Sequence, residues 1–158
     1  MPSIRSLVKT LQFDFPQFTF IASQDFRWSV DQQRIFYDKN SANSSYLLHE
    51  LAHGLLAHSD YKRDIELLAM ERDAWHYAIA ALSKKYSVRI EEENVQDSLD
   101  TYRDWLHSRS TCPNCTAVGV QTNVREYSCL ACGERWRVND ARSCALRRYS
   151  LTKKNTPI

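Results

Sequence analysis

Glycine and proline are scarce in this sequence, and long apolar runs are missing from it. Only 3 glycines and 4 prolines occur among 158 residues, which disfavours a turn-rich all-β barrel and favours helices joined by short connections. Near the start, polar residues interrupt every apolar stretch, so nothing resembles a secretory signal or a bilayer-spanning segment. The sequence therefore indicates a cytoplasmic protein with no membrane partner.

An excess of charge of one sign is also lacking, while the apolar content is ordinary. The 21 Lys and Arg residues against 19 Asp and Glu residues give a net charge of +2, too small for the whole surface to attract nucleic acid or anionic lipid. Hydrophobic residues make up 43% and charged residues 25%, which is typical of a folded soluble protein and not of a disordered one. Any argument from charge must therefore be local.

The basic residues are concentrated towards the C-terminus. Residues 112–158 hold 8 basic and 3 acidic side chains, whereas residues 1–111 hold 13 basic and 16 acidic ones. This asymmetry indicates two units with different roles.

The spacing of apolar residues predicts an α+β fold. The period typical of amphipathic helices predicts helices over 2–12, 46–57, 64–84 and 92–107. Aromatic and β-branched residues over 18–37 predict two or three short strands with a hairpin.

The segment His49-Glu50-Leu51-Ala52-His53 fits the pattern H-E-x-x-H. Residues i and i+4 lie about one turn apart on an α-helix, so both imidazoles can bind one Zn²⁺ from the same side. Glu50 then stands beside them, close enough to reach a zinc-bound water. The alternative is two hydrogen-bonded histidines on a half-buried helix.

A catalytic zinc needs a third protein ligand and one open position for water. A metzincin-like continuation would require Gly at position 56 and His or Asp at position 59, but the chain has Leu56 and Ser59. His58 and Asp60 each miss that pattern by one residue. A carboxylate on the following helix is the remaining source of the ligand.

Glu71 is the acid that the helical period singles out. Turning about 100° per residue along the predicted helix 64–84 places Glu71 in the middle of an apolar arc. That arc consists of Leu67, Leu68, Ala74, Trp75, Ala78, Ile79 and Leu82. A carboxylate in such a position needs a positive partner, either a zinc ion or, in the alternative, Arg63 or Arg72.

His49 to His53 followed by Glu71-x-x-Ala74 resembles the gluzincin group of zinc metallopeptidases, such as the ImmA/IrrE-type enzymes and the minigluzincins, over about residues 18–82. The resemblance implies His49, His53 and Glu71 as zinc ligands. Relatives usually have Asp or Asn four residues after the glutamate, where this chain has Trp75. The support of a zinc histidine must then come from elsewhere.

The resemblance implies a zinc-dependent endopeptidase that cleaves a protein or peptide substrate. Glu50 is expected to act as the general base, taking a proton from a zinc-activated water and passing it to the leaving amine. Tyr61, His76 and Tyr77 are candidates for stabilising the oxyanion, but no spacing selects one of them. The hairpin within 26–37 is the candidate for holding the substrate by backbone pairing.

Four of the five cysteines form two Cys-x-x-Cys units. Cys112 and Cys115 are separated from Cys129 and Cys132 by thirteen residues, a spacing typical of a zinc ribbon. Four thiolates complete the tetrahedron, so this zinc would be structural. The alternative is two redox-active thiol pairs, and we expect Cys144 to pack as a small apolar residue.

Basic and aromatic residues alternate around this module. Arg135, Trp136 and Arg137 are candidates for contact with nucleic acid or with an acidic protein, although a solvated basic surface would look the same. A second function class is therefore a non-enzymatic adaptor. A third follows from the order of aromatic strands, HELAH helix and ribbon, which resembles SprT-type proteases that act near DNA; their His-Gly-x-x-Trp segment is missing here.

The predicted organisation has three parts. Residues 1–108 form a small metallopeptidase-like core of helices plus a short antiparallel sheet, and residues 109–150 form the four-cysteine ribbon. Residues 151–158 form a disordered tail. The chain would hold two zinc ions, one catalytic and one structural.

Overall fold

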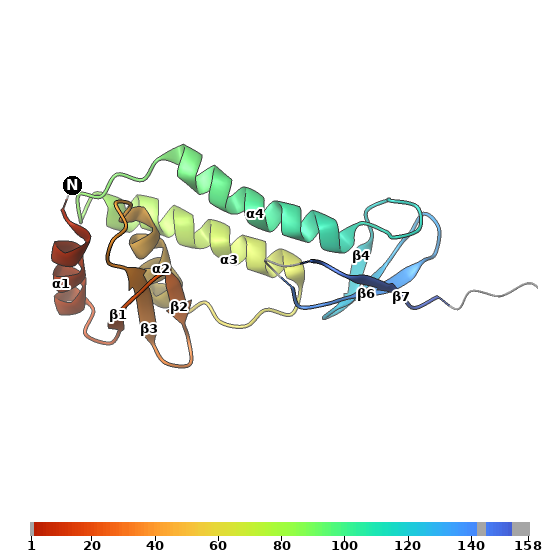
Figure 1. The fold of residues 1–158 in the computed structure, drawn as a ribbon, viewed down its shortest axis with the longest axis horizontal. Coiled ribbons are helices and arrows are strands. Elements are labelled where there is room, and N and C mark those ends of the chain that lie inside the picture. Colours follow the sequence, from red (N-terminus) through yellow and green to blue (C-terminus); the bar gives the residue numbers. More distant parts are fainter. Residues whose placement is uncertain (1, 142–144, 153–158) are drawn as a thin grey trace, which may run out of the picture. The chain divides into compact units, whose positions relative to one another are not determined.

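The computed structural model describes residues 2–141 and 145–152, and Figure 1 shows its elements. Cys144 and residues 153–158 of the predicted tail lie outside the described residues. The helices are α1 (Ile4–Asp14), α2 (Ser45–Leu55), α3 (Asp64–Tyr77), the π-helical turn η1 (Ala78–Ser83) and α4 (Glu92–Ser110). The strands are β1 (Thr19–Ser23), β2 (Arg27–Ser29), β3 (Arg34–Asp38), β4 (Val120–Asn123), β5 (Glu126–Ser128), β6 (Arg135–Val138) and β7 (Arg148–Ser150). The predicted α+β class is confirmed.

The first sheet has the strand order β1-β3-β2 and is mixed, whereas an antiparallel sheet was predicted. β2 and β3 form the expected antiparallel hairpin, but β1 lies on the other side of β3 and runs parallel to it. The register of this pair joins Phe20 to Ile35, and both side chains are buried. Burial of these two residues therefore favours the pairing of β1 with β3. β2 is left at an edge of the sheet.

Helices α1 and α2 and this sheet all contribute residues to the apolar core of the N-terminal unit. The apolar stripe of α1 is buried, with Leu11 fully so, as its helical period predicts. Ser3 starts α1 by accepting a hydrogen bond from the backbone N–H of Ser6. On α2, Leu47, Leu48 and Leu51 are fully buried. The helix that carries the H-E-x-x-H motif is thus fixed by core packing.

The predicted helix 64–84 is helical from Asp64 to Ser83 but changes from an α-helix to a π-helix. The α-helix α3 ends at Tyr77, and the π-helical turn η1 continues it to Ser83. Ala78 and Leu82 of this turn are buried in the same core as Ala74. Glu71 lies on the buried face, as the helical period predicts.

The C-terminal sheet has the antiparallel order β4-β5-β6-β7. Its small core contains Tyr127, Trp136 and Val138 together with Cys112 and Cys129. Strand β6 alternates exposed and buried residues, which places Arg135 and Arg137 on the outer face. The ribbon thus has one face packed and one exposed.

The chain divides into two compact units. One contains residues 1–60 and 69–97, and the other contains residues 61–68 and 98–158. The boundaries after residues 68 and 97 fall within α3 and α4, and the predicted division into 1–108 and 109–150 stays a prediction. None of the helices in the described ranges combines the length and the apolar character needed to cross a membrane.

Candidate metal centres

Helix α2 presents His49 and His53 on one face, one turn apart. Its first turn is held by Asn43, whose side-chain oxygen accepts a hydrogen bond of 3.0 Å from the backbone N–H of Ser45. Both histidines are buried. The sequence therefore places two imidazoles inside the protein, where their polar atoms need partners.

Glu71 of α3 completes this cluster, which we call the His/His/Glu centre. The Nε2 atom of His49 lies 3.0 Å from Oε2 of Glu71 and 3.1 Å from Nε2 of His53. The Nε2 atom of His53 lies 3.5 Å from the same carboxylate oxygen. The predicted ligands are thus brought together, and Glu71 pairs with the histidines, whereas Arg72 forms an exposed ion pair with Asp73.

The spacing of these three atoms fits a tetrahedral metal ion. Ligands bound to Zn²⁺ at about 2.0–2.1 Å would lie about 3.3 Å from one another. The observed separations of 3.0, 3.1 and 3.5 Å are close to that value. Three donors converge on one point, so His49, His53 and Glu71 could hold a metal ion.

The charges within the centre stabilise one another. Burial alone would raise the pKa of Glu71, but hydrogen bonds and charge interactions with His49 and His53 outweigh it and lower that pKa to about 2. Burial would lower the pKa of His53, but its interactions with Glu71 and with Glu50 raise it. A carboxylate that stays ionised inside the protein is a suitable ligand for a dication.

Glu50 lies beside the centre and is held by the sheet. Its Oε2 accepts a hydrogen bond of 2.7 Å from the backbone N–H of Trp28 in the edge strand β2. Burial raises the pKa of Glu50, and the neighbouring histidines His49 and His53 partly offset this effect. A carboxylate with a raised pKa next to a possible metal site is a candidate for accepting and releasing a proton.

His58 also belongs to this site, although the sequence analysis assigned it no role. Its Nδ1 lies 2.9 Å from Nδ1 of His53, and the two rings meet edge to face with their centroids 5.0 Å apart. The signal in the sequence was a third histidine five residues after His53, which misses the metzincin-like pattern by one residue. That spacing places the His58 imidazole against Nδ1 of His53, so that His58 is not one of the candidate metal ligands.

Trp75 lies one turn after Glu71 on α3 and packs against His49. Its ring stacks on that of His49 at 4.2 Å between centroids, with 23° between the planes. Within the described part of the chain, Nδ1 of His49 is buried and has no hydrogen-bond partner. His49 is therefore oriented by ring packing.

The four cysteines form the second cluster, which we call the tetracysteine centre. The Sγ atoms of Cys112 and Cys132 lie 3.7 Å apart, and those of Cys115 and Cys129 lie 3.5 Å apart. Thiolates on a tetrahedral zinc at about 2.3 Å would lie about 3.8 Å apart, whereas a disulfide needs about 2.05 Å. All four are free cysteines, so this group could hold a metal ion and contains no disulfide.

The two loops of the tetracysteine centre share one backbone geometry. Thr116 follows the first Cys-x-x-Cys unit with φ 65°, and Gly133 follows the second with φ 75°. A left-handed residue reverses the chain after each pair and turns both sulfurs to the same side. The backbone N–H of Asn114 also donates to Sγ of Cys112 at 3.4 Å.

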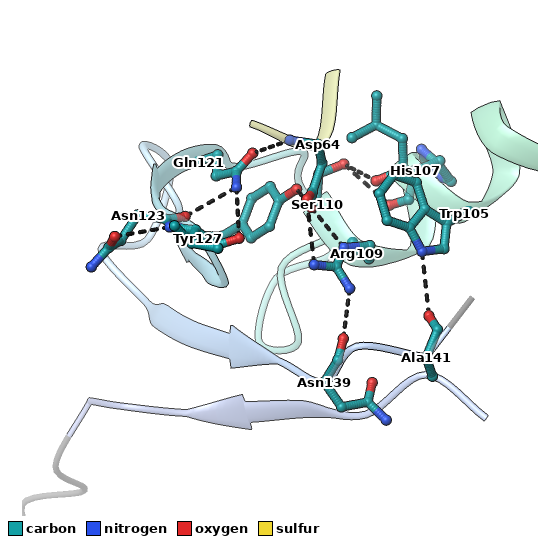
Figure 2. Close-up of polar contacts among 12 residues, drawn as sticks. Asp64, Trp105, His107, Arg109, Ser110, Gln121, Asn123, Tyr127, Asn139 and Ala141 are labelled. Carbon is teal, nitrogen blue, oxygen red and sulfur yellow. Dashed lines mark hydrogen bonds and ion pairs between the residues drawn. The ribbon is translucent and has the colours of Figure 1, made fainter. Parts of the chain in front are cut away.

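A buried ion pair supports the C-terminal unit (Figure 2). Arg109 donates from Nε to Asp64 at 2.6 Å and from Nη1 to the carbonyl of Asn139 at 2.6 Å. Tyr127 donates its hydroxyl to the same carboxylate. Burial and the hydrogen bond to Asp64 raise the pKa of Tyr127. Asp64, on which these donors converge, begins helix α3.

The structure corrects the predicted contact surface of the ribbon. Trp136 is fully buried, stacks on Tyr127 and donates its indole N–H to the carbonyl of Arg109 at 2.9 Å. It cannot contact a partner, because strand alternation turns it to the packed face. Arg135 and Arg137 lie on the opposite, exposed face, as a contact role requires.

The structure describes the surroundings of two of the three candidates for stabilising the oxyanion. His76 is exposed, and Tyr77 packs against the apolar core.

Comparisons with protein-family models, with curated proteins and with solved structures found no match. Function is therefore inferred from the geometry of the two centres.

Proposed function

We propose that this protein is a zinc-dependent endopeptidase of gluzincin type whose second zinc stabilises the C-terminal ribbon. The observation that carries the proposal is the convergence of His49, His53 and Glu71 within 3.0 to 3.5 Å beside Glu50. Three protein ligands leave a fourth position for water, which is the coordination of catalytic zinc sites.

A zinc ion in this centre would supply Lewis-acid chemistry, activating water and polarising a carbonyl group. The chain's own residues supply the proton transfer. Glu50, with its raised pKa, accepts a proton from the attacking water and delivers it to the leaving amine. The Trp28 N–H orients the Glu50 carboxylate for both steps.

The edge strand β2 supports a peptide as the substrate. It lies at the border of the first sheet, so an extended chain could pair with it through backbone hydrogen bonds. The Trp28 N–H already donates to Glu50, so a peptide docked on β2 would lie next to the general base.

The test compares the wild type with Glu50→Gln, both loaded with zinc, on a library of peptides whose new termini are read by mass spectrometry. We expect cleavage by the wild type and a loss of about 10²–10⁴-fold in Glu50→Gln with zinc content unchanged. Retention of full cleavage by Glu50→Gln would contradict the proposal.

A second candidate function, an adaptor that binds through the ribbon, is favoured by one observation. Arg137 pairs across strands with Tyr149, and both side chains are exposed on the outer face that also carries Arg135. Guanidinium groups beside an exposed aromatic ring suit phosphate contact and base stacking. The test is single-stranded DNA binding: it should weaken in Arg135→Ala/Arg137→Ala and with added salt, and remain in Glu50→Gln.

A further inference from the structure

The proposed catalytic centre leaves one of its neighbours unexplained. His58 is half-buried, and its Nδ1 lies 2.9 Å from Nδ1 of His53, on the side of that ring that faces away from Glu71 and His49. A histidine that binds a metal usually donates its other ring N–H to a carboxylate, a carbonyl or water. Here the group in that position is a second imidazole.

We infer that His58 is a positioning residue that fixes His53 in the orientation and tautomer needed to bind the metal. The inference rests on the proposed metal centre and adds a residue to it. If Nε2 of His53 binds the ion, the proton of the neutral ring is on Nδ1. This N–H group then donates a hydrogen bond to Nδ1 of His58. His58 carries its own proton on Nε2.

The backbone at the end of α2 explains why His58 lies there. The N–H of His58 donates to the carbonyl of His53 at 3.0 Å, and the N–H of Ala57 donates to that of Gly54 at 3.1 Å. These two bonds define a Schellman motif, with Ala57 in the left-handed conformation at φ 53°. The motif brings residue 58 back beside residue 53.

A second contact holds the His58 segment in place. The carbonyl of His58 accepts a hydrogen bond of 3.1 Å from the indole Nε1 of Trp28. The backbone N–H of the same Trp28 holds Glu50. One residue of β2 is thus connected both to the general base and to the residue behind the ligand His53.

The two histidine ligands are supported differently. His49 is stacked on Trp75, and its Nδ1 has no partner among the residues that the structure describes. His53 has Nδ1 of His58 as a hydrogen-bond partner behind its ring. Loss of the His58 acceptor should therefore weaken the metal centre through His53, since His49 cannot compensate by a hydrogen bond of its own.

The test measures zinc affinity of the full chain by competition with a chromophoric chelator. In His58→Phe the ring contact can persist but the acceptor is lost, whereas in His58→Asn an amide oxygen lies close to the position of Nδ1. We expect one of the two zinc ions to bind about 10–100-fold more weakly in His58→Phe, with affinity largely restored in His58→Asn. His107→Ala, at an exposed position of α4, serves as the matched histidine control and should change neither zinc ion.

Nuclear magnetic resonance gives a readout that a packing role would not change. With ¹⁵N-labelled histidine, the zinc-loaded wild type should show a slowly exchanging His53 Nδ1 proton, which becomes fast exchanging in His58→Phe and is recovered in His58→Asn. Equal zinc affinity in His58→Phe and wild type, or equal losses in His58→Phe and His58→Asn, would overturn the positioning role while leaving the metal centre intact. A wild type with zinc at the cysteines alone would overturn the metal centre and this inference together.

Discussion

The two metal centres use different numbers and kinds of ligand. The tetracysteine centre takes four sulfurs from two loops, and Cys115 and Cys132 are exposed to solvent. The His/His/Glu centre takes three atoms from two helices, and all three residues are buried. Four thiolates fill a tetrahedron, whereas three ligands leave one position open. Under the proposed function, the tetracysteine centre would therefore be a closed, structural metal site and the His/His/Glu centre an open, reactive one.

The two units also differ in the size of their buried hydrophobic clusters. Among the described residues, the hydrophobic cluster of the N-terminal unit contains 16 buried residues, whereas that of the ribbon contains 5, two of which are cysteines. Apolar burial can therefore hold the first unit together without an ion. We expect the ribbon to need a metal ion, because so small a core cannot offset the loss of conformational entropy.

Removal of the ribbon metal should have the largest effect on stability. We expect Cys129→Ala to abolish amide protection in β5 and β6, since structural zinc supplies about 10–16 kcal/mol in small zinc modules. Amides of α1 and α2 should remain protected because their core is apolar. Hydrogen exchange read by mass spectrometry measures both regions at once.

The matched control is His49→Ala, which removes a ligand from the other centre. It should leave β5 and β6 protected. If the strands of the ribbon stay protected in Cys129→Ala, the proposed dependence of the ribbon on metal is wrong.

The buried ion pair of the C-terminal unit should have the next largest effect. Arg109→Ala leaves the Asp64 carboxylate buried without its cation, which should lower the free energy of unfolding by about 3–5 kcal/mol. Arg125→Ala, which removes an exposed pair with Asp140, should cost no more than about 1 kcal/mol. Urea denaturation measures both variants, and equal losses would show that the buried pair contributes nothing beyond a surface pair.

The turn after α2 should give the smallest effect, and one of opposite sign. Ala57 is exposed and has φ 53°, a conformation that costs a residue with a Cβ about 1–2 kcal/mol. Ala57→Gly should relieve this strain and raise the stability by about 0.5–1 kcal/mol, after allowing for the flexibility of unfolded glycine. A lower melting temperature in Ala57→Gly would contradict the left-handed turn that places His58 beside His53.

Local spacing accounts for what could be predicted. The i and i+4 separation places His49 and His53 on one helical face, and the helical period places Glu71 on the buried side of α3. Two Cys-x-x-Cys units likewise determine the cluster of four sulfurs. In each case a regular backbone or a short loop fixes the geometry within a few residues.

Features that depend on tertiary packing could not be predicted in this way. The parallel pairing of β1 with β3 follows from burial of Phe20 and Ile35, which lie far apart in the sequence. Trp136 was expected at a contact surface because its neighbours are basic, but strand alternation buries it. The role of His58 depends on the left-handed conformation of Ala57. The sequence does not predict this conformation, because glycine is the residue that usually indicates it.

The most direct test of the account is the zinc content of the purified full chain and of two variants. We predict two zinc ions per chain in the wild type and one each in His49→Ala and Glu71→Ala, with the remaining ion bound by the cysteines. A wild type with a single zinc, or a Glu71→Ala protein that keeps both ions, would contradict the central claim that Glu71 binds a metal ion together with His49 and His53.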